Sequence, residues 1–237
     1  MHDATFTRPS SPAGPTAARA SRVVVDGKFF RLDGRKFYVK GVTYGPFAPK
    51  PDGETFPDPE QAARDFAQIV ELGANVLRVY YVPPAWILDL AARHGLKFLV
   101  DIPWPKHLCF LDSAEARRNA LRTVRQAVEN SRGHPAIFAY SVVNEISADI
   151  VRWSGPARVE RFIEQLIDEV RAVDPHCLCT FTSYPPTEFL QPQNADFVCF
   201  NVYLHDPKAH DGYLARLQTL ADARPLVLGE FGMDSLR

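Results

Sequence analysis

Short apolar runs alternate with amphipathic segments along the chain from Val23 onward. Several runs consist of Val, Ile, Leu and Phe without alternating polar residues, which is typical of strands that are buried on both faces. Such strands indicate a parallel sheet that is covered by helices. The predicted strands are Phe37–Val42, Asn75–Tyr81, Leu96–Ile102, Ile137–Val143, Leu178–Thr182, Phe197–Val202 and Leu226–Leu228.

The segments between these runs carry apolar residues at helical spacing. In the first of them, Ala62, Phe66 and Ile69 lie three or four residues apart, and Gly73 follows as a C-terminal stop signal. Helices are predicted over Pro59–Leu72, Pro84–His94, Ala114–Asn130, Ala157–Val173 and Gly212–Ala223. This regular alternation of strands and helices predicts an α/β protein.

An open doubly wound sheet and a closed (β/α)8 barrel both fit this alternation. The segment Gly41–Gly45 has neither the glycine spacing of a dinucleotide-binding turn nor a following helix start, which favours the barrel. Only seven strands precede Arg237, so the expected fold is a TIM barrel lacking the eighth strand in this chain. We expect either a truncated chain or a last strand supplied from elsewhere. A hairpin over Val23–Arg31 is predicted before the barrel.

The composition is that of a globular protein with little preference for charged partners. Of the 237 residues, 46% are hydrophobic and 23% are charged, and the formal net charge is -1. This balance argues against a nucleic-acid or membrane partner. Residues 1–21 are rich in Ser, Pro, Ala and Thr, which predicts a disordered tail before a single domain over 22–237. No signal-peptide core is visible, so we expect a cytoplasmic protein.

The cysteines and histidines do not suggest a metal centre. Cys109, Cys177, Cys179 and Cys199 lack the spacing of a zinc ribbon and are too sparse for a disulfide scaffold, so they are interpreted as reduced core residues. No HxH pair ends the first strand, which makes a metal-dependent barrel hydrolase a poor fit. We expect neither a metal nor another cofactor.

Two glutamates follow buried strands directly. Asn144-Glu145 ends the apolar run that starts at Ile137, and Glu230 follows Leu226–Gly229. The carboxyl ends of parallel barrel strands open on one face, so the two carboxyl groups are expected to face each other there. Cleavage of a glycosidic bond needs such a pair. The alternative interpretation of Asn144-Glu145 is a helix N-cap followed by an acid in the first turn.

Further polar and aromatic residues accompany the pair. Arg78 lies inside an apolar strand and therefore needs a buried partner, for which Glu230 is the candidate, although a structural ion pair is the alternative. Tyr203 ends the sixth predicted strand and is a candidate donor to the same carboxylate.

Three other residues are weaker candidates for substrate contacts. Trp104 follows the third strand, where its indole could stack on a sugar ring or simply pack. His107 is either a polar contact to the substrate or a loop residue, and Tyr44, after the first strand, is equally ambiguous.

The segments that carry these residues resemble a known group of enzymes. Arg132–Glu145, with its His134-Pro135 and Asn144-Glu145 pairs, resembles the fourth-strand motif of retaining β-glycosidases of glycoside hydrolase clan A, particularly families 2 and 5. Residues 27–42 resemble the start of the family 2 barrel, and residues 226–232 are similar to the nucleophile strand. The resemblance covers about residues 23–233. It departs from the family pattern at Tyr140, where Trp is common, and at the eighth strand.

The resemblance implies a role for each matching residue. Glu145 is the expected general acid/base, and Asn144 the expected contact to the sugar 2-hydroxyl. Glu230 is the expected nucleophile, oriented by Arg78 and Tyr203. The implied substrate is an oligo- or polysaccharide with β-glycosidic bonds.

Two alternative functions remain open at the sequence level. A transglycosylase of the same chemistry would pass the sugar to another sugar instead of to water. A non-catalytic carbohydrate-binding domain of a larger protein would keep the fold without turnover, and an additional domain or chain could complete its barrel.

Overall fold

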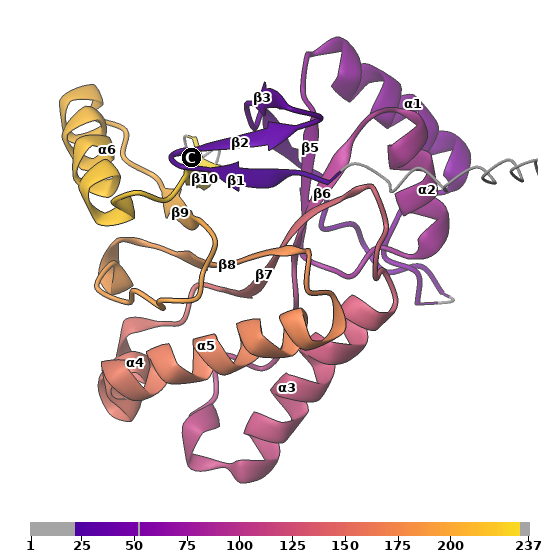
Figure 1. Cartoon of the computed structure of the whole chain (residues 1–237). Helices are drawn as coiled ribbons and strands as arrows, with labels where there is room; N and C mark the ends of the chain where they lie inside the picture. Colours follow the sequence, from indigo (N-terminus) through magenta and orange to yellow (C-terminus); the bar gives the residue numbers. More distant parts are fainter. Residues whose placement is uncertain (1–21, 52, 233–237) are drawn as a thin grey trace, which may run out of the picture.

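The computed structural model describes residues 22–51 and 53–232. The tail predicted over residues 1–21 lies outside the described residues. The described part forms a nearly closed barrel of parallel strands with helices on its outer side (Figure 1). The strands are, in their spatial order, β4 (Gly41–Thr43), β5 (Val76–Val79), β6 (Lys97–Asp101), β7 (Ile137–Asn144), β8 (Leu178–Ser183), β9 (Val198–Val202) and β10 (Leu226–Phe231).

Helices connect the successive barrel strands, as the apolar spacing predicts, except that β8 and β9 are separated only by a 3-10 turn. The helices are α1 (Pro59–Glu71), α2 (Ala85–Arg93), α3 (Ala114–Glu129), α4 (Ala148–Ser154), α5 (Pro156–Val173) and α6 (Pro207–Ala221), with short 3-10 turns η1 (Phe110–Asp112) and η2 (Pro185–Thr187). Helix α4 was not predicted, since a helix of two turns gives too short a pattern. Helix α6 starts five residues before its predicted start, because the Asp206 side chain caps it by accepting from the backbone N–H of Ala209 at 2.7 Å.

The first predicted strand, Phe37–Val42, is in fact divided between two sheets. Its first residue ends β3 (Arg35–Phe37), which forms an antiparallel sheet with β1 (Val24–Asp26) and β2 (Phe29–Leu32). Its last residues belong to β4 in the barrel. At the break, Asn75 accepts from the backbone N–H of Lys40 at 2.9 Å and donates to the carbonyl of Tyr38 at 2.8 Å. The side chain of Asn75 thus replaces the lost ladder bonds.

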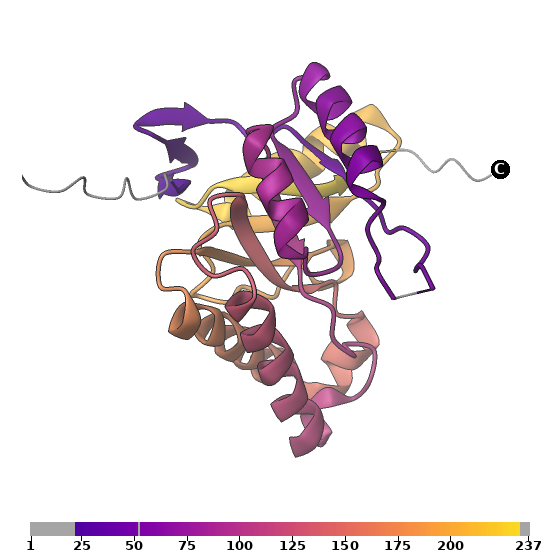
Figure 2. The ribbon, with the colours of Figure 1, turned by 90° about the vertical axis from the view of Figure 1, so that its right-hand side faces the viewer.

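The antiparallel sheet closes the amino-terminal end of the barrel, where Figure 2 shows it in indigo. Phe30 is 5% exposed and reaches into the barrel from this sheet. Its ring makes T-shaped contacts with the rings of Phe138 and Phe197, at centroid distances of 5.1 and 5.3 Å. The predicted hairpin therefore acts as a plug.

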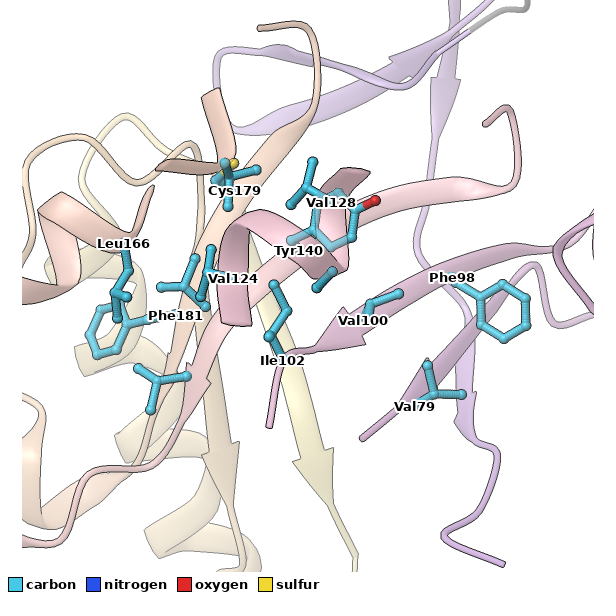
Figure 3. Close-up of a cluster of buried hydrophobic side chains, with 14 of the residues drawn as sticks. Val79, Phe98, Val100, Ile102, Val124, Val128, Tyr140, Leu166, Cys179 and Phe181 are labelled. Atoms are coloured by element: carbon cyan, nitrogen blue, oxygen red, sulfur yellow. The ribbon is translucent and has the colours of Figure 1, made fainter. Parts of the chain in front are cut away.

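The larger core lies between the barrel strands and the outer helices (Figure 3). Tyr140 is fully buried there, and its hydroxyl shares a hydrogen bond with Ser131 Oγ. A tyrosine is therefore accommodated where related strands often carry Trp, because its one polar atom has a partner. Cys177, Cys179 and Cys199 are buried as expected, whereas Cys109 is exposed because it precedes η1 in a surface loop.

The barrel has a gap between β4 and β10. Among the described residues, β4 pairs only with β5, and β10 pairs only with β9. A cavity of about 1130 Å³ lies at this gap, and its walls include both edge strands, the plug sheet and the side chains of Tyr203 and Glu230. The expectation of a TIM barrel without its eighth strand is confirmed.

The role of the plug is tested by replacing Phe30 with Ala. We expect this change to lower the free energy of unfolding by about 3 kcal/mol or more, since it leaves a void among packed aromatic rings. Phe29→Ala is the matched control, because the neighbouring ring is 44% exposed, and it should cost about 1 kcal/mol or less. Urea unfolding measures both, and equal losses would contradict the plug.

Candidate active site

Polar side chains from five neighbouring strands meet at the carboxyl-terminal end of the barrel. They come from β5, β6, β7, β9 and β10. In the sheet these strands are consecutive, apart from β8, which lies between β7 and β9. The site contains two carboxyl groups, Glu145 and Glu230, together with the cation Arg78. Strand ends therefore position the chemistry, and the helices only support it.

Arg78 is the centre of the hydrogen-bond network and is 3% exposed. Its Nε donates to Asp101 Oδ2 at 2.7 Å. Its Nη1 donates to Asn201 Oδ1 at 3.1 Å and to Glu230 Oε1 at 2.9 Å, and its Nη2 donates to Asn144 Oδ1 at 2.9 Å. Burial is the largest single influence and opposes the charge on Arg78, but the charge and hydrogen bond of Asp101, together with nearby acidic groups, raise the pKa of the guanidinium overall. A single buried cation thus connects four other strands.

Glu230 receives three hydrogen bonds. Besides Arg78, the Tyr80 hydroxyl donates to Oε1 at 2.7 Å and the Tyr203 hydroxyl donates to Oε2 at 3.0 Å. Burial and the bond to Glu230 raise the pKa of both tyrosines, although Arg78 works against this, so the phenols remain protonated donors. The contacts predicted from Arg78 and Tyr203 to this carboxylate are present, and Tyr80 adds one that was not predicted.

Glu145 is held in an unusual backbone conformation. Its φ is +49°, in the left-handed region that non-glycine residues rarely occupy, and its backbone N–H donates to the carbonyl of Thr182 at 2.8 Å. Its Oε1 accepts from Asn201 Nδ2 at 2.7 Å. The turn after β7 therefore directs the carboxyl group toward the barrel axis instead of continuing into a helix. This geometry differs from an N-cap, which was the alternative interpretation.

Asn201 connects the two carboxyl groups. Its Nδ2 donates to Glu145, and its Oδ1 accepts from the Arg78 guanidinium that also binds Glu230. Asn201 was not predicted as a site residue, although an amide inside the apolar run Phe197–Val202 was a usable signal. Tyr80 could also have been found, since it lies two residues after Arg78 and so shares its face of the strand.

Gly229 allows these side chains to approach one another. The register between β9 and β10 shifts between Leu228 and Glu230, which brings the Glu230 carboxylate into the site. A Cβ on Gly229 would lie 2.9 Å from Asn201 Oδ1, 2.9 Å from Cys199 Sγ and 3.0 Å from Arg78 Nη1. Only glycine fits there without displacing the network.

Lys106 adds a second cation beside the pair. It lies in the loop after β6, half-buried, where its ammonium interacts with the charges of Glu145, Asp101 and Glu230. Burial lowers the pKa of its ammonium.

The hydrogen bonds of Trp104 and Tyr44 go to groups other than the two carboxyl groups. Trp104 is 9% exposed, donates from Nε1 to the carbonyl of Val142 at 2.8 Å and packs against Phe110 and Phe162, so its indole lies in the core instead of at the mouth. Tyr44 is 6% exposed, its ring packs against Phe47 and Phe66, and its hydroxyl donates to Asp65 of α1.

His107 lies exposed in the loop after β6.

Within residues 22–51 and 53–232, no group of three or more His, Cys, Asp and Glu side chains is arranged to hold a metal ion. The same part of the chain contains no helix with the length and apolarity needed to cross a membrane.

A parallel barrel with two glutamates at its strand ends defines a class of protein. The fold, the site and the comparisons together identify a TIM-barrel catalytic domain of clan A glycoside hydrolases. The model of the glucanosyltransferase family, glycoside hydrolase family 72, matches residues 15–174, which is 160 of the 237 residues. The chain therefore belongs to this family.

Individual relatives support the same class. The chain is 26% identical over 226 residues to a β-glucuronidase of Sus scrofa, covering 90% of this chain and 33% of that protein. It is 29% identical over 133 residues to a 1,3-β-glucanosyltransferase of Aspergillus fumigatus, covering 54% of this chain and 29% of that one. The chain thus spans about a third of the length of these relatives.

Solved structures show the same fold. The β-glucuronidase of Bifidobacterium dentium in complex with coumarin-3-O-glucuronide superposes with a TM-score of 0.75 at 20% identity, covering 92% of this chain and 36% of that one. The β-glucuronidase of Dictyoglomus thermophilum superposes with a TM-score of 0.73 at 22% identity, covering 91% of this chain and 40% of that one.

The close packing around Gly229 is tested by replacing it with Ala. We expect Gly229→Ala to reduce turnover at least tenfold and to destabilise the fold by about 1–3 kcal/mol, because its Cβ collides with three buried atoms. Gly212→Ala is the control, since nothing lies within 4 Å of that Cβ on helix α6. It should be neutral or stabilising by up to about 1 kcal/mol. Thermal unfolding and glycoside hydrolysis report both effects, and wild-type behaviour of Gly229→Ala would contradict this close packing.

Proposed function

We propose that this domain catalyses transfer at β-glycosidic bonds by a retaining double displacement, with Glu230 as the nucleophile and Glu145 as the general acid/base. The observation that carries the proposal is the unequal environment of the two carboxyl groups. Glu230 receives three hydrogen bonds, one of them from a buried guanidinium, whereas a single side-chain amide donates to Glu145. Three donors on Glu230 fix the position of its carboxylate, as attack on a single carbon atom requires.

In the first step, Glu230 attacks the anomeric carbon and Glu145 protonates the departing glycosidic oxygen. The bond between the anomeric carbon and this oxygen breaks as a glycosyl ester forms on Glu230. In the second step, Glu145 removes a proton from the incoming hydroxyl, which displaces Glu230 and restores the β configuration. We propose that Asn144 contacts the sugar 2-hydroxyl, and the hydrogen bonds that its Oδ1 accepts from Arg78 and Asn201 support this role by fixing its amide.

The incoming hydroxyl in the second step decides the product. Water gives hydrolysis, and a second sugar gives transglycosylation. Membership of the glucanosyltransferase family supports transfer to a sugar, while the β-glucuronidase relatives support hydrolysis. We propose an oligo- or polysaccharide substrate with β linkages for either outcome.

We also propose that an additional polypeptide segment, from another domain or another chain, completes the barrel between β4 and β10. Both strands offer unpaired backbone groups on facing edges of the described sheet, and the cavity between them is lined by exposed apolar side chains such as Tyr38, Leu72 and Phe231. The same cavity reaches Glu230, so this segment would border the sugar site.

The nucleophile assignment is tested with Glu230→Gln. We expect turnover to fall at least 10⁴-fold while sugar binding persists, because the amide fills the same space without attacking carbon. Steady-state hydrolysis of an aryl β-glycoside, together with calorimetric binding of the product sugar, measures the two effects. Glu71→Gln, on the exposed end of α1, is the control and should match wild type. Substantial residual turnover by Glu230→Gln would remove the assignment.

The acid/base assignment is tested with Glu145→Gln. The first step should slow strongly for an alkyl β-glycoside, which needs protonation of the leaving oxygen. It should slow much less for an aryl glycoside with an acidic phenol, which leaves without that proton. A pre-steady-state burst of the released phenol is the expected signature, since the second step still lacks its base. Equal losses on both substrates would exclude Glu145 as the acid.

A further inference from the structure

One of the three tryptophans exposes its indole to solvent. Trp86 and Trp104 pack against the main core, whereas Trp153 is 70% exposed. Trp153 lies on helix α4, whose buried residues are Ile150, Val151 and Ser154. The helix therefore packs without the help of this indole, and packing does not explain why a large apolar ring stands there.

The exposed indole is held in one orientation. Its Nε1 donates to Asp112 Oδ2 at 2.7 Å, which ties α4, after β7, to η1, after β6. Loops after adjacent barrel strands are thereby joined at the carboxyl-terminal end of the barrel. Leu108, in the same loop as Asp112, is 52% exposed. A fixed aromatic face loses little conformational entropy when a ligand stacks on it.

Trp153 follows Glu145 closely in the chain, which puts it on the leaving-group side of the cleaved bond. It lies eight residues after Glu145, and the three residues 145–147 link β7 to α4. Three extended residues and five helical rises place the two Cα atoms no more than roughly 18 Å apart. Glu145 protonates the leaving oxygen, so the leaving group lies on the side of Glu145 and its following loop.

We propose that Trp153 is a stacking platform for the pyranose ring on the leaving-group side of the cleaved bond, with Asp112 as its positioning residue. This inference rests on the proposed function. The ligand is a sugar unit that presents an apolar ring face, either the departing unit of an oligosaccharide in the first step or the acceptor in the second. Indole rings offer a flat apolar surface with a polar edge, and Asp112 occupies that edge.

The platform would favour sugars over water in the second step. An acceptor that is already stacked on Trp153 has its hydroxyl near Glu145 at a high effective concentration. The proposal therefore links one surface residue to the choice between transfer and hydrolysis.

The test compares substrates that differ only on the leaving-group side. Wild type, Trp153→Ala, Trp153→Phe and Asp112→Ala are assayed on β-1,3-linked gluco-oligosaccharides of two to six units and on an aryl β-glycoside. This linkage is the one named for the fungal relative. We expect Trp153→Ala to lower kcat/KM about tenfold for the oligosaccharides and to lower the ratio of transfer to hydrolysis products. Its activity on the aryl glycoside should stay within about twofold of wild type.

The companion variants separate stacking from folding. Trp153→Phe keeps an aromatic face and should recover most of the oligosaccharide activity. Asp112→Ala keeps the indole but removes the hydrogen bond that orients it, so we expect a loss of oligosaccharide activity between those of Trp153→Phe and Trp153→Ala. Val70→Ala, which removes an exposed apolar side chain from helix α1, should change neither substrate. Equal losses of Trp153→Ala on both substrates, or no loss on the oligosaccharides, would overturn the platform.

A binding measurement separates this inference from the proposed function. Oligosaccharide is titrated into Glu230→Gln protein while the indole N–H signals are followed by NMR. A shift of the signal that disappears in the Glu230→Gln, Trp153→Phe double variant supports the platform even if wild type shows no turnover. Binding that leaves the Trp153 signal unchanged, or absence of binding, contradicts the platform whatever the catalytic result.

Discussion

The site depends on one buried guanidinium. Arg78 uses three nitrogens to bind Asp101, Asn144, Asn201 and Glu230, so strands β5, β6, β7, β9 and β10 must close around it for its charge to be compensated. A buried cation without these partners would cost several kcal/mol. The same contacts that neutralise the cation therefore hold the two halves of the proposed machinery in register.

Two local deviations from regular structure complete the geometry. Glu145 occupies the left-handed region directly after a buried strand, and the register shift at Gly229 turns Glu230 inward. Both lie near the ends of strands that are mostly apolar. The surrounding barrel enforces these conformations, since strain of this kind persists only where packing over-determines it. Regular strands thus provide the rigidity, and their irregular ends provide the chemistry.

Much of this arrangement could be predicted from the sequence because it is local. Continuous apolar runs marked the strands, helical spacing marked five of the six helices, and the acids at the strand ends marked the site. Predictions about packing were less successful. Trp104 and Tyr44 follow strands as a site residue would, but their polar atoms find partners in Val142 and Asp65 and their rings join the core.

The sequence by itself determined the α/β alternation, the incomplete barrel and the two candidate carboxyl groups, because these follow from patterns within single strands and helices. Only the tertiary structure decided which side chains surround them. Asn201 and Tyr80 became part of the site because distant strands lie side by side, and Trp153 was left exposed while Trp104 was buried and Trp86 partly buried against the core. Contacts between residues far apart in the chain depend on strand register and loop direction, which no local pattern encodes.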